Sequence, residues 1–318
     1  MGKDRLIVIL GPTAVGKTAL SLDLAAALGT EIISGDALLV YRGFDIGTAK
    51  PSLAERRGIR HHLIDIMKPD EPYTVTLFQQ QAAACIHELN AAGKIPILAG
   101  GTGLYVQALL EGYAFNQAAG HEAFRREMAA LAEREGSAAL YARLQQADPQ
   151  AAATIDPHNV RRVIRALETQ HYGGESISRQ RQADGTAGSL VYDALVIGLR
   201  RERQALYARI NARVEQMFAA GLADEVRSLL ARGVTPEMPA MQGIGYRETA
   251  AYLRGELTRE QAVEQIQLHT RHFAKRQLTW YRRMPYIEWF DVDTLTPAQL
   301  LARVQMRVKA WLEQPLEA

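Results

Sequence analysis

The sequence predicts an α/β fold in which a parallel sheet covered by helices carries an inserted all-helical domain. Short β-rich runs alternate with helical patterns through the first hundred residues, which is typical of a parallel sheet with helices on both faces. These runs lie at 6–10, 31–34, 62–66 and 95–99. A glycine-rich loop follows the first run, and after Gly112 the β signals stop until a further strand pattern at 191–199. We therefore expect the sheet to resume after a long helical segment.

Length and composition are those of a globular protein. The 318 residues are 47% hydrophobic, enough for one large or two modest domains, and the formal charge of +2 is near balance. Any affinity for nucleic acid must then come from local clusters of Lys and Arg. Cys85 is the one cysteine, which excludes an internal disulfide and a cysteine-based zinc module. We find no signal segment and no apolar run of about 20 residues, so we expect a cytoplasmic protein without a membrane span.

The first strand pattern leads directly into a loop that suits a polyphosphate. The loop reads Gly11, Pro12, Thr13, Ala14, Val15, Gly16, Lys17 and Thr18. Its glycines let backbone N–H groups turn inward, Lys17 places a charge against the terminal phosphate, and the Thr18 hydroxyl can ligate Mg²⁺. The alanine-rich segment 18–28 supplies the helix whose N-terminus faces the anion. This order predicts a P-loop NTPase-like core, but not which phosphate compound is bound.

Polar residues also follow the later strand patterns, at the sheet edge where functional loops gather. Asp36 ends the second run; its carboxylate can ligate Mg²⁺, act as a general base for an incoming nucleophile, or cap a helix. Asp65 lies near the end of the third run and can hold Mg²⁺ through water or serve as a cap or ion-pair partner. Thr102, in the turn 100–103, can contact a leaving phosphate or an attacking group, or simply belong to a tight turn. We expect these loops to meet the phosphate loop at one crevice.

Two histidine pairs do not predict a metal site. His61 with His62 and His269 with His272 lack a third ligand at a recognised spacing. Neighbouring residues of a strand also point to opposite faces. We therefore expect no zinc.

The middle and the end of the chain are mainly helical in pattern. Residues 121–169 carry alanine-rich repeats with charged faces. We therefore divide the chain into an α/β core with C-terminal helices, at 1–114 and 191–318, and a helical insertion at 115–190. Further helices are expected at 203–232, 247–254 and 259–283, with a last strand at 286–290.

Basic residues are clustered although the total charge is small. Between 269 and 283 there are five Lys or Arg and no acid, interleaved with Phe273, Trp280 and Tyr281, a pattern that suits phosphate contact and base stacking. The five are Arg271, Lys275, Arg276, Arg282 and Arg283. A second cluster comprises Arg161, Arg162 and Arg165. A solvated helix face would explain either cluster alone, but the two together favour binding of nucleic acid.

In this combination the motifs resemble the tRNA dimethylallyltransferase family, also called tRNA isopentenyltransferases, along nearly the whole chain. Besides the phosphate loop, the resemblance rests on VYR at 40–42, DIGTAKP at 45–51, HHLID at 61–65, GGTGLY at 100–105, RRVIRALE at 161–168, AMQGIGY at 240–246 and AKRQLTW at 274–280. Members of this family move the dimethylallyl group of dimethylallyl diphosphate to N6 of the adenosine just 3′ of the anticodon, position 37 of tRNA. The resemblance implies the same activity here.

The resemblance also implies roles for individual positions. Loop 11–18 would hold the diphosphate of the donor with Mg²⁺ beside it, with Lys17 taking part in catalysis. Asp36 would accept the proton of N6, and Thr102 would lie beside the reacting centre. The insertion 115–190 would grip the anticodon stem-loop, which a monomer can cover. The positions expected to contact tRNA are Asp36, Ala37, Leu38, Leu39, Thr102, Arg161, Arg162, Val163, Ile164, Arg165, Gln242, Gly243, Gly245, Tyr246, Arg247, Lys275 and Arg276.

Some positions depart from the usual family pattern. The family usually has Asp-Ser-x-Gln before Val-Tyr, where this chain has Asp36, Ala37, Leu38 and Leu39, and Gln81 stands where an acid is usual. Each missing polar side chain could cost about 1–3 kcal/mol of discrimination between bases. We expect these departures to affect tRNA specificity before prenyl transfer.

Other activities are compatible with part of the pattern. A P-loop kinase of a small metabolite also uses an Asp after the second strand, but it needs no basic and aromatic helix at 269–283. Prenylation of a free adenine nucleotide would leave the helical insertion and the arginine clusters without a role. An RNA-binding module without catalysis would leave the polar residues of the crevice unexplained.

Overall fold

The computed structural model describes residues 2–114, 121–172 and 189–314 of the chain. The chain divides into two compact units. The α/β unit consists of Met1–Leu110 and Leu190–Ala318, and the helical unit is Glu111–Ser189. No helix among the described residues is long and apolar enough to cross a membrane.

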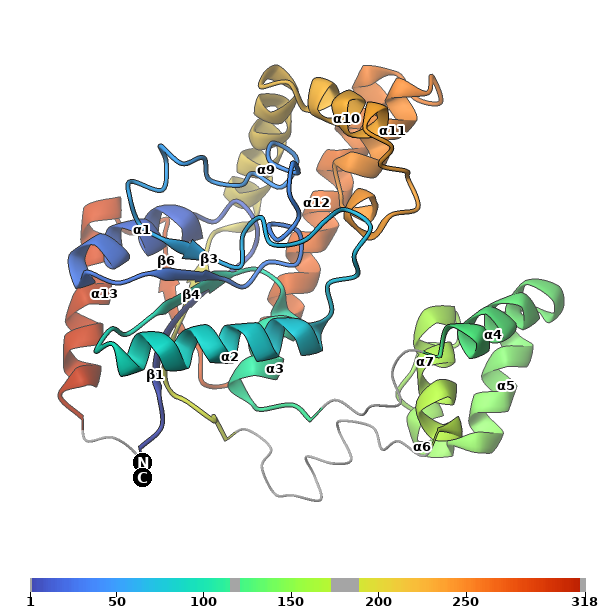
Figure 1. Cartoon of the computed structure of the whole chain (residues 1–318), viewed down its shortest axis with the longest axis horizontal. Helices are drawn as coiled ribbons and strands as arrows, with labels where there is room; N and C mark the ends of the chain where they lie inside the picture. Colours follow the sequence, from blue (N-terminus) through green and yellow to red (C-terminus); the bar gives the residue numbers. More distant parts are fainter. Residues whose placement is uncertain (1, 115–120, 173–188, 315–318) are drawn as a thin grey trace. The chain divides into compact units, whose positions relative to one another are not determined.

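The α/β unit is built on one sheet of six strands (Figure 1). Their order across the sheet is β3-β2-β4-β1-β5-β6. The strands are β1 Arg5–Leu10, β2 Ile32–Ser34, β3 His61–His62, β4 Ile97–Gly100, β5 Asp193–Arg200 and β6 Glu288–Asp291. Every neighbouring pair is parallel. The predicted parallel α/β sheet is thus confirmed, including the strand that returns after the helical segment.

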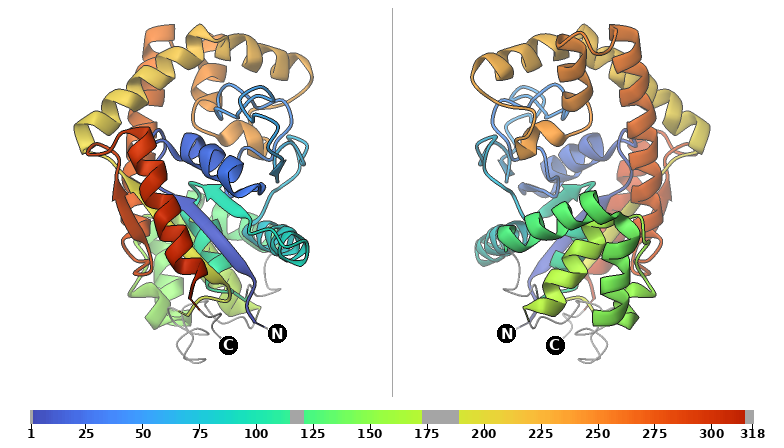
Figure 2. Two further views of the ribbon diagram at one scale, coloured as in Figure 1. Left: turned by 90° about the vertical axis from the view of Figure 1, so that its left-hand side faces the viewer. Right: turned by 90° about the vertical axis from the view of Figure 1, so that its right-hand side faces the viewer.

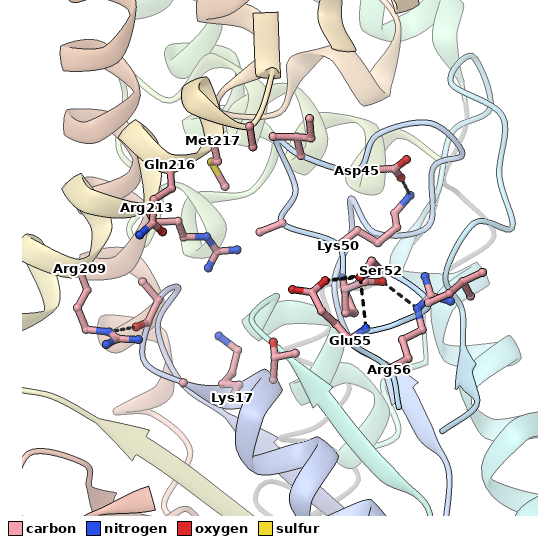
Figure 3. Close-up of a pocket in the computed structure, with 18 of the residues that line it drawn as sticks. Lys17, Asp45, Lys50, Ser52, Glu55, Arg56, Arg209, Arg213, Gln216 and Met217 are labelled. Carbon is pink, nitrogen blue, oxygen red and sulfur yellow. Dashed lines mark hydrogen bonds and ion pairs between the residues drawn. The ribbon is translucent and has the colours of Figure 1, made fainter. Parts of the chain in front are cut away.

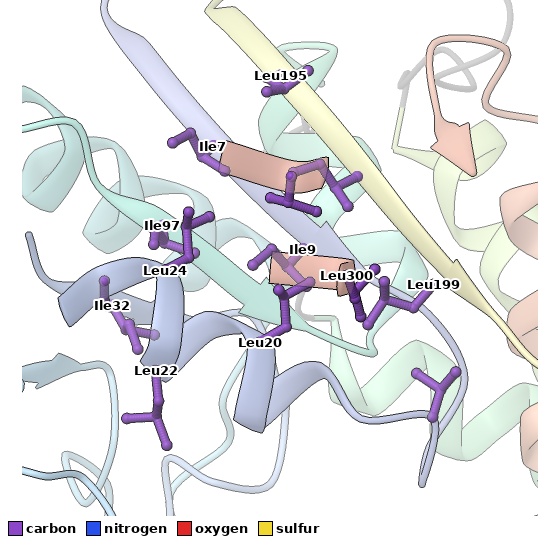
Figure 4. Packing of buried hydrophobic residues seen from close by; sticks show 14 of the residues in the cluster. Ile7, Ile9, Leu20, Leu22, Leu24, Ile32, Ile97, Leu195, Leu199 and Leu300 are labelled. Carbon is purple, nitrogen blue, oxygen red and sulfur yellow. The ribbon is translucent and has the colours of Figure 1, made fainter. Parts of the chain in front are cut away.

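Alternating side chains of β1 divide the apolar core into two layers. Ile7 and Ile9 point to one face of the sheet and pack in a cluster that includes Leu24 of α1 (Lys17–Leu28), as Figure 4 shows. Leu6 and Val8 point to the other face and pack in a second cluster. Because β1 is buried on both faces, its sequence is a continuous apolar run.

Helices cover both faces of this sheet (Figure 2). Side chains of α1, α9 and α13 join the cluster of Ile7, while those of α2 and α3 join the cluster of Leu6. Near the site, α10 and α11 pack instead on Tyr41 and Phe44 in a smaller cluster. The bounds are α2 Val75–Ala91, α3 Gly103–Leu110, α9 Arg203–Ala219, α10 Leu222–Ala231, α11 Tyr246–Leu253, α12 Arg259–Tyr281 and α13 Pro297–Leu312, with a 3₁₀ turn η1 at Pro239–Gln242.

Some elements differ from those expected. β3 ends at His62 and does not reach residue 66, because Leu63 and Asp65 have positive φ values of 60° and 58° that no strand accommodates. The helix expected at 203–232 is interrupted at Gly221, whose φ of 98° separates α9 from α10. The strand and loop patterns did not indicate α13, although its buried residues recur every four positions at 300, 304 and 308.

The helical unit has an apolar core of its own. Its helices are α4 Glu122–Glu135, α5 Ser137–Ala147, α6 Pro149–Ala152 and α7 Val160–His171. They pack around Leu140, Leu144 and Val163. Glu168 of α7 is fully buried and pairs with Arg125 at 3.0 Å and Arg165 at 2.7 Å. Burial by itself raises the pKa of a carboxyl group, but these two hydrogen bonds hold the pKa of Glu168 below its usual value.

Truncation of Ile9 is expected to destabilise the α/β unit strongly. The side chain is fully buried, so Ile9→Ala should lower the free energy of unfolding by about 2–5 kcal/mol through lost burial and a residual cavity. Urea unfolding followed by tryptophan fluorescence measures this. Met306→Ala is the control, because the Met306 side chain is 65% exposed and its loss should change the free energy by less than about 0.5 kcal/mol. An equal loss of unfolding free energy in the two variants would contradict the conclusion that Ile9 is part of the packed core.

Candidate active site

A cavity of about 960 Å³ lies beside the phosphate loop at the carboxyl edge of the sheet (Figure 3). It is lined by the phosphate loop with the start of α1, by the loop that spans 45–56, and by one face of α9. Lys17 and Thr18 reach it from α1, and Arg213 reaches it from α9. The cavity is therefore bordered by a helix N-terminus and by cations from two separate elements, a combination that attracts an anion.

Two glycines shape the phosphate loop. Gly11 has a φ of 152°, and a Cβ atom there would lie 2.7 Å from the carbonyl oxygen of Leu199, so no side chain fits. Gly16 has a φ of 118° in the left-handed region, which lets α1 begin at Lys17. The first N–H groups of α1 have no partner within the helix. These N–H groups can donate hydrogen bonds to a bound oxyanion.

Lys17 lies across this loop. Its Nζ donates to the carbonyl oxygens of Gly11 and Pro12, each at 3.0 Å. Burial lowers the pKa of Lys17 to about 8, while the carboxylate of Asp36 opposes the shift and Arg213 adds to it. Neutral carbonyl groups stabilise an ammonium only partly. An anion bound in the loop would favour the charged form.

Asp36 and Thr102 lie on two neighbouring loops that are bonded to each other. The hydroxyl of Thr102 accepts the N–H of Ala37 at 3.1 Å. The Oδ1 atom of Asp36 accepts the N–H of Leu38 at 2.8 Å, which fixes the carboxylate in a turn. No helix begins in the described residues directly after Asp36, so it is not a helix cap.

Two buried side chains of α12 join the phosphate loop to the loop at 100–103. Gln277 accepts the N–H of Thr13 at 2.9 Å and donates to the carbonyl oxygen of Gly101 at 2.7 Å. The hydroxyl of Tyr281 donates to the same carbonyl oxygen at 2.9 Å. The expected stacking of Tyr281 on a base is therefore wrong, because its ring is fully buried and its hydroxyl holds the loop.

Two arginines of α9 belong to the site, although the sequence patterns did not single them out. Arg209 donates to the carbonyl oxygen of Ala14 at 3.0 Å. Within the described part of the chain, Arg213 has neither a hydrogen bond nor an ion pair. Burial lowers the pKa of Arg213, and the nearby carboxylate of Asp36 opposes that shift. In the sequence these residues look like the solvated face of a helix, so only the fold distinguishes them.

The wall formed by the loop at 45–56 depends on Lys50. Its buried ammonium group contacts the carbonyl oxygen of Tyr41 at 2.8 Å, Asp45 at 2.7 Å and Asp65 at 2.5 Å. Asp65 thus serves as an ion-pair partner. This arrangement favours that role over the alternative of a Mg²⁺ ligand.

Glu225 of α10 fixes the same loop from outside. Its carboxylate accepts the backbone N–H groups of residues 45–47 at distances between 2.7 and 3.2 Å. It also accepts the hydroxyl of Tyr246 at 2.7 Å. The ring of Tyr246 is fully buried, and a Cβ atom on Gly47 would lie 2.5 Å from it. Glycine at 47 is therefore needed for this close packing.

The positions expected to contact RNA differ in exposure. The half-buried ones are Asp36, Ala37, Leu38, Leu39, Thr102 and Arg165. The exposed ones are Arg161, Arg162, Gln242, Arg247, Lys275 and Arg276. The buried ones are Val163, Ile164, Gly243, Gly245 and Tyr246. The side chains of Val163, Ile164 and Tyr246 do not face the surface where RNA would bind, because they belong to the cores of their units. Contacts through side chains are therefore expected from the exposed and the half-buried positions.

Gln81, Ala37 and Leu38 have defined partners. The Oε1 atom of Gln81 accepts the hydroxyl of Tyr73 at 2.9 Å, a bond that a carboxylate would accept as well. Ala37 and Leu38 pack against the apolar clusters. At residues 37 and 38 the loop is therefore held by apolar packing.

One histidine of each pair is bonded to a carboxylate. His62 lies 2.7 Å from Glu31, and His269 lies 2.7 Å from Glu248. Among residues 2–114, 121–172 and 189–314, no three His, Cys, Asp or Glu side chains come together as a metal-binding group. A metal ion at the cavity would depend on the bound substrate for most of its ligands.

Comparison with known proteins relates the chain to one family. A model of IPP transferase matches residues 39–284, and one of isopentenyl transferase matches residues 4–71. A tRNA dimethylallyltransferase of Geobacillus kaustophilus is 49% identical over 302 residues, which cover 95% of this chain and 94% of the relative. One of Shouchella clausii is 49% identical over 92% of this chain and 93% of its own length.

Solved structures agree with these relatives. A tRNA isopentenylpyrophosphate transferase of Bacillus halodurans has a TM-score of 0.73 and 42% identity, covering 98% of this chain and 97% of its own. A eukaryotic dimethylallyltransferase acting on tRNA has a TM-score of 0.83 and 28% identity, covering 99% of this chain and 81% of its own.

The lowered pKa of Lys17 predicts that affinity for inorganic diphosphate falls as the pH rises through about 8. Above this pH the free protein must take up a proton at Lys17 to bind, so affinity should fall by up to about tenfold per pH unit. Isothermal titration calorimetry between about pH 7 and 9.5 measures the change. The control is Lys17→Arg, whose guanidinium stays charged throughout. If the affinity of the wild type depends on pH in the same way as that of Lys17→Arg, the pH dependence does not come from Lys17 and the prediction is wrong.

Proposed function

The chain belongs to the tRNA dimethylallyltransferase family, and from that premise we propose how its residues transfer a dimethylallyl group to tRNA. The donor is dimethylallyl diphosphate, and the acceptor is N6 of the adenosine at position 37, next to the anticodon. The products are N6-isopentenyladenosine in tRNA and diphosphate. The observation that carries this proposal is the meeting of the phosphate loop, Lys17 and Arg213 at one cavity, with Asp36 beside them.

The cavity beside the phosphate loop is the donor site of this proposal. The open N–H groups at residues 11–18 and the cations of Lys17 and Arg213 bind the diphosphate. Arg213 is free to do so because no described residue pairs with it. The cavity has room for the prenyl group besides the diphosphate, with a volume of about 960 Å³.

Mg²⁺ fits this site as a companion of the diphosphate. The side chain of Thr18 is exposed and lines the cavity, and within the described residues no hydrogen bond ties its hydroxyl. Because Mg²⁺ usually keeps several waters and binds substrate phosphates, one protein hydroxyl is a suitable contribution. When bound, the ion neutralises part of the diphosphate charge.

The reaction exchanges one bond for another at the allylic carbon. The bond from this carbon to the diphosphate oxygen breaks, and its electron pair leaves with the diphosphate. A bond from N6 to the same carbon forms, and the proton of N6 passes to Asp36. The amino group of adenine is a poor nucleophile, so stabilisation of the leaving diphosphate by Lys17 and Arg213 is the larger contribution.

The acceptor base approaches from the loops of Asp36 and Thr102. A base paired or stacked in RNA must leave its stack to reach such a crevice. The ammonium group of Lys17 also lies close to the loop of Thr102, since its Nζ is 3.7 Å from the place of a Cβ atom on Gly101. We therefore assign Lys17 a position between the two substrates. We assign the exposed arginines of the helical unit and of α11 and α12 to the anticodon stem-loop, and we assign the protein to the cytoplasm as a monomer.

Mass analysis of nucleosides tests the function directly. The protein, tRNA, Mg²⁺ and isotopically labelled dimethylallyl diphosphate should yield labelled N6-isopentenyladenosine and one diphosphate per modified base. A free adenine nucleotide in place of tRNA should yield little product. Consumption of ATP with a small acceptor and no RNA, or a labelled free nucleotide, would contradict the proposal.

Replacement of Asp36 by Asn should remove the base and keep the fold. The Asn oxygen can still accept the N–H of Leu38, and we expect kcat to fall by about 10²–10⁴-fold. Binding of the donor near pH 7 should change little. The control is Asp224→Asn, an exposed carboxylate that pairs with Arg227 on α10 and should retain full activity. An active Asp36→Asn enzyme would exclude Asp36 as the base.

A further inference from the structure

A second cavity, of about 480 Å³, lies between the start of α9, the last half of α12 and the end of β5. Its charged lining residues are all cations. They are Arg200, Arg201, Arg203, Lys275 and Arg282. We call this cavity the basic groove. In a chain whose net charge is +2, such a local concentration of positive charge is a feature to be explained.

Much of this charge is not neutralised by the protein. Arg201 pairs with Asp293 at 2.8 Å, and Arg200 lies 3.7 Å from Asp291. In the described residues, the other three cations of the groove form no ion pair, and all three are exposed. The Nε atom of Arg201 is buried without a hydrogen-bond partner among these residues. Donors are thus left over for a ligand.

Aromatic rings form the apolar part of the groove. Tyr207 and Trp289 line it beside the cations. The guanidinium of Arg203 lies over the ring of Tyr207, at 5.5 Å from its centre. This contact holds the Arg203 side chain in place without consuming its hydrogen-bond donors.

The groove is separate from the donor site. None of the residues that line it lines the cavity beside the phosphate loop. The helix α12 contributes to both regions: Gln277 and Tyr281 hold the phosphate loop and the loop at 100–103, while Lys275, Thr279 and Arg282 line the groove. A diphosphate in the loop would therefore not occupy the groove.

We propose that the basic groove binds the phosphodiester backbone of the RNA substrate, outside the crevice in which the reaction takes place. Charge complementarity favours this ligand, because exposed Arg and Lys side chains on two helices and a strand match successive phosphates of a chain. A single small anion is usually held by buried groups and backbone N–H donors instead. The inference rests on the proposed function, since it assumes that tRNA is the substrate.

Binding of an anticodon stem-loop RNA tests the groove. The double variant Arg203→Gln/Arg282→Gln should bind the RNA about tenfold more weakly, measured by fluorescence anisotropy at several salt concentrations. The slope of log K against log salt should become smaller by about 1–2, because up to two phosphate contacts are lost. The KM for tRNA should rise, and the KM for dimethylallyl diphosphate should stay the same.

A matched control removes the same charge elsewhere. Arg303→Gln/Lys309→Gln on α13 changes two exposed cations that do not line the groove, and it should bind RNA as the wild type does. Equal affinity and salt slope in both double variants would overturn the proposal. So would a higher KM for the donor with unchanged RNA affinity, which would identify a small-anion site. If the wild type fails to prenylate tRNA, the proposed function fails; an active wild type with unaffected groove variants refutes the groove alone.

Discussion

The geometry of the site depends on the bonds that α12 makes to the phosphate loop and to the loop at 100–103. Gln277 satisfies a donor at Thr13 and an acceptor at Gly101, and Tyr281 satisfies the same acceptor. Gly101, Gln277 and Tyr281 are buried, so a missing partner would cost about 1–3 kcal/mol for each of these groups. The two loops therefore hold a common geometry only when α12 is docked. A helix near the end of the chain thus completes a site that begins at residue 11.

Burial of cations prepares the cavity for its ligand. Lys17 and Arg213 are both shifted toward lower pKa by loss of water, and the carboxylate of Asp36 opposes the shift in each case. An anion that enters finds donors already placed and partly desolvated, so little reorganisation accompanies its binding. The same carboxylate that balances these charges is the proposed base. Electrostatic balance and proton transfer are thereby linked through one residue.

Several residues, some of them in the family motifs, hold the site without taking part in its chemistry. Lys50 ties Asp45 to Asp65, and Glu225 binds three backbone N–H groups of the same loop. Buried charges are tolerated there because each has close partners of opposite charge or polarity. Asp65, a candidate metal ligand by its place after a strand, belongs to this support. A motif therefore marks where the backbone must be held as well as where chemistry occurs.

The sequence by itself determined the parallel sheet, the phosphate loop and the family, since each depends on short local patterns: apolar runs buried on both faces, glycines at strained turns, and motifs in a given order. It also indicated Asp36 and Thr102 as candidates, because both follow strands. Only the tertiary structure decided that Tyr246 and Tyr281 are buried supports, that Arg213 lines the cavity, and that Asp65 is paired. Exposure and pairing depend on which distant elements pack together, and residues of a polar helix face look alike until the fold buries some of them.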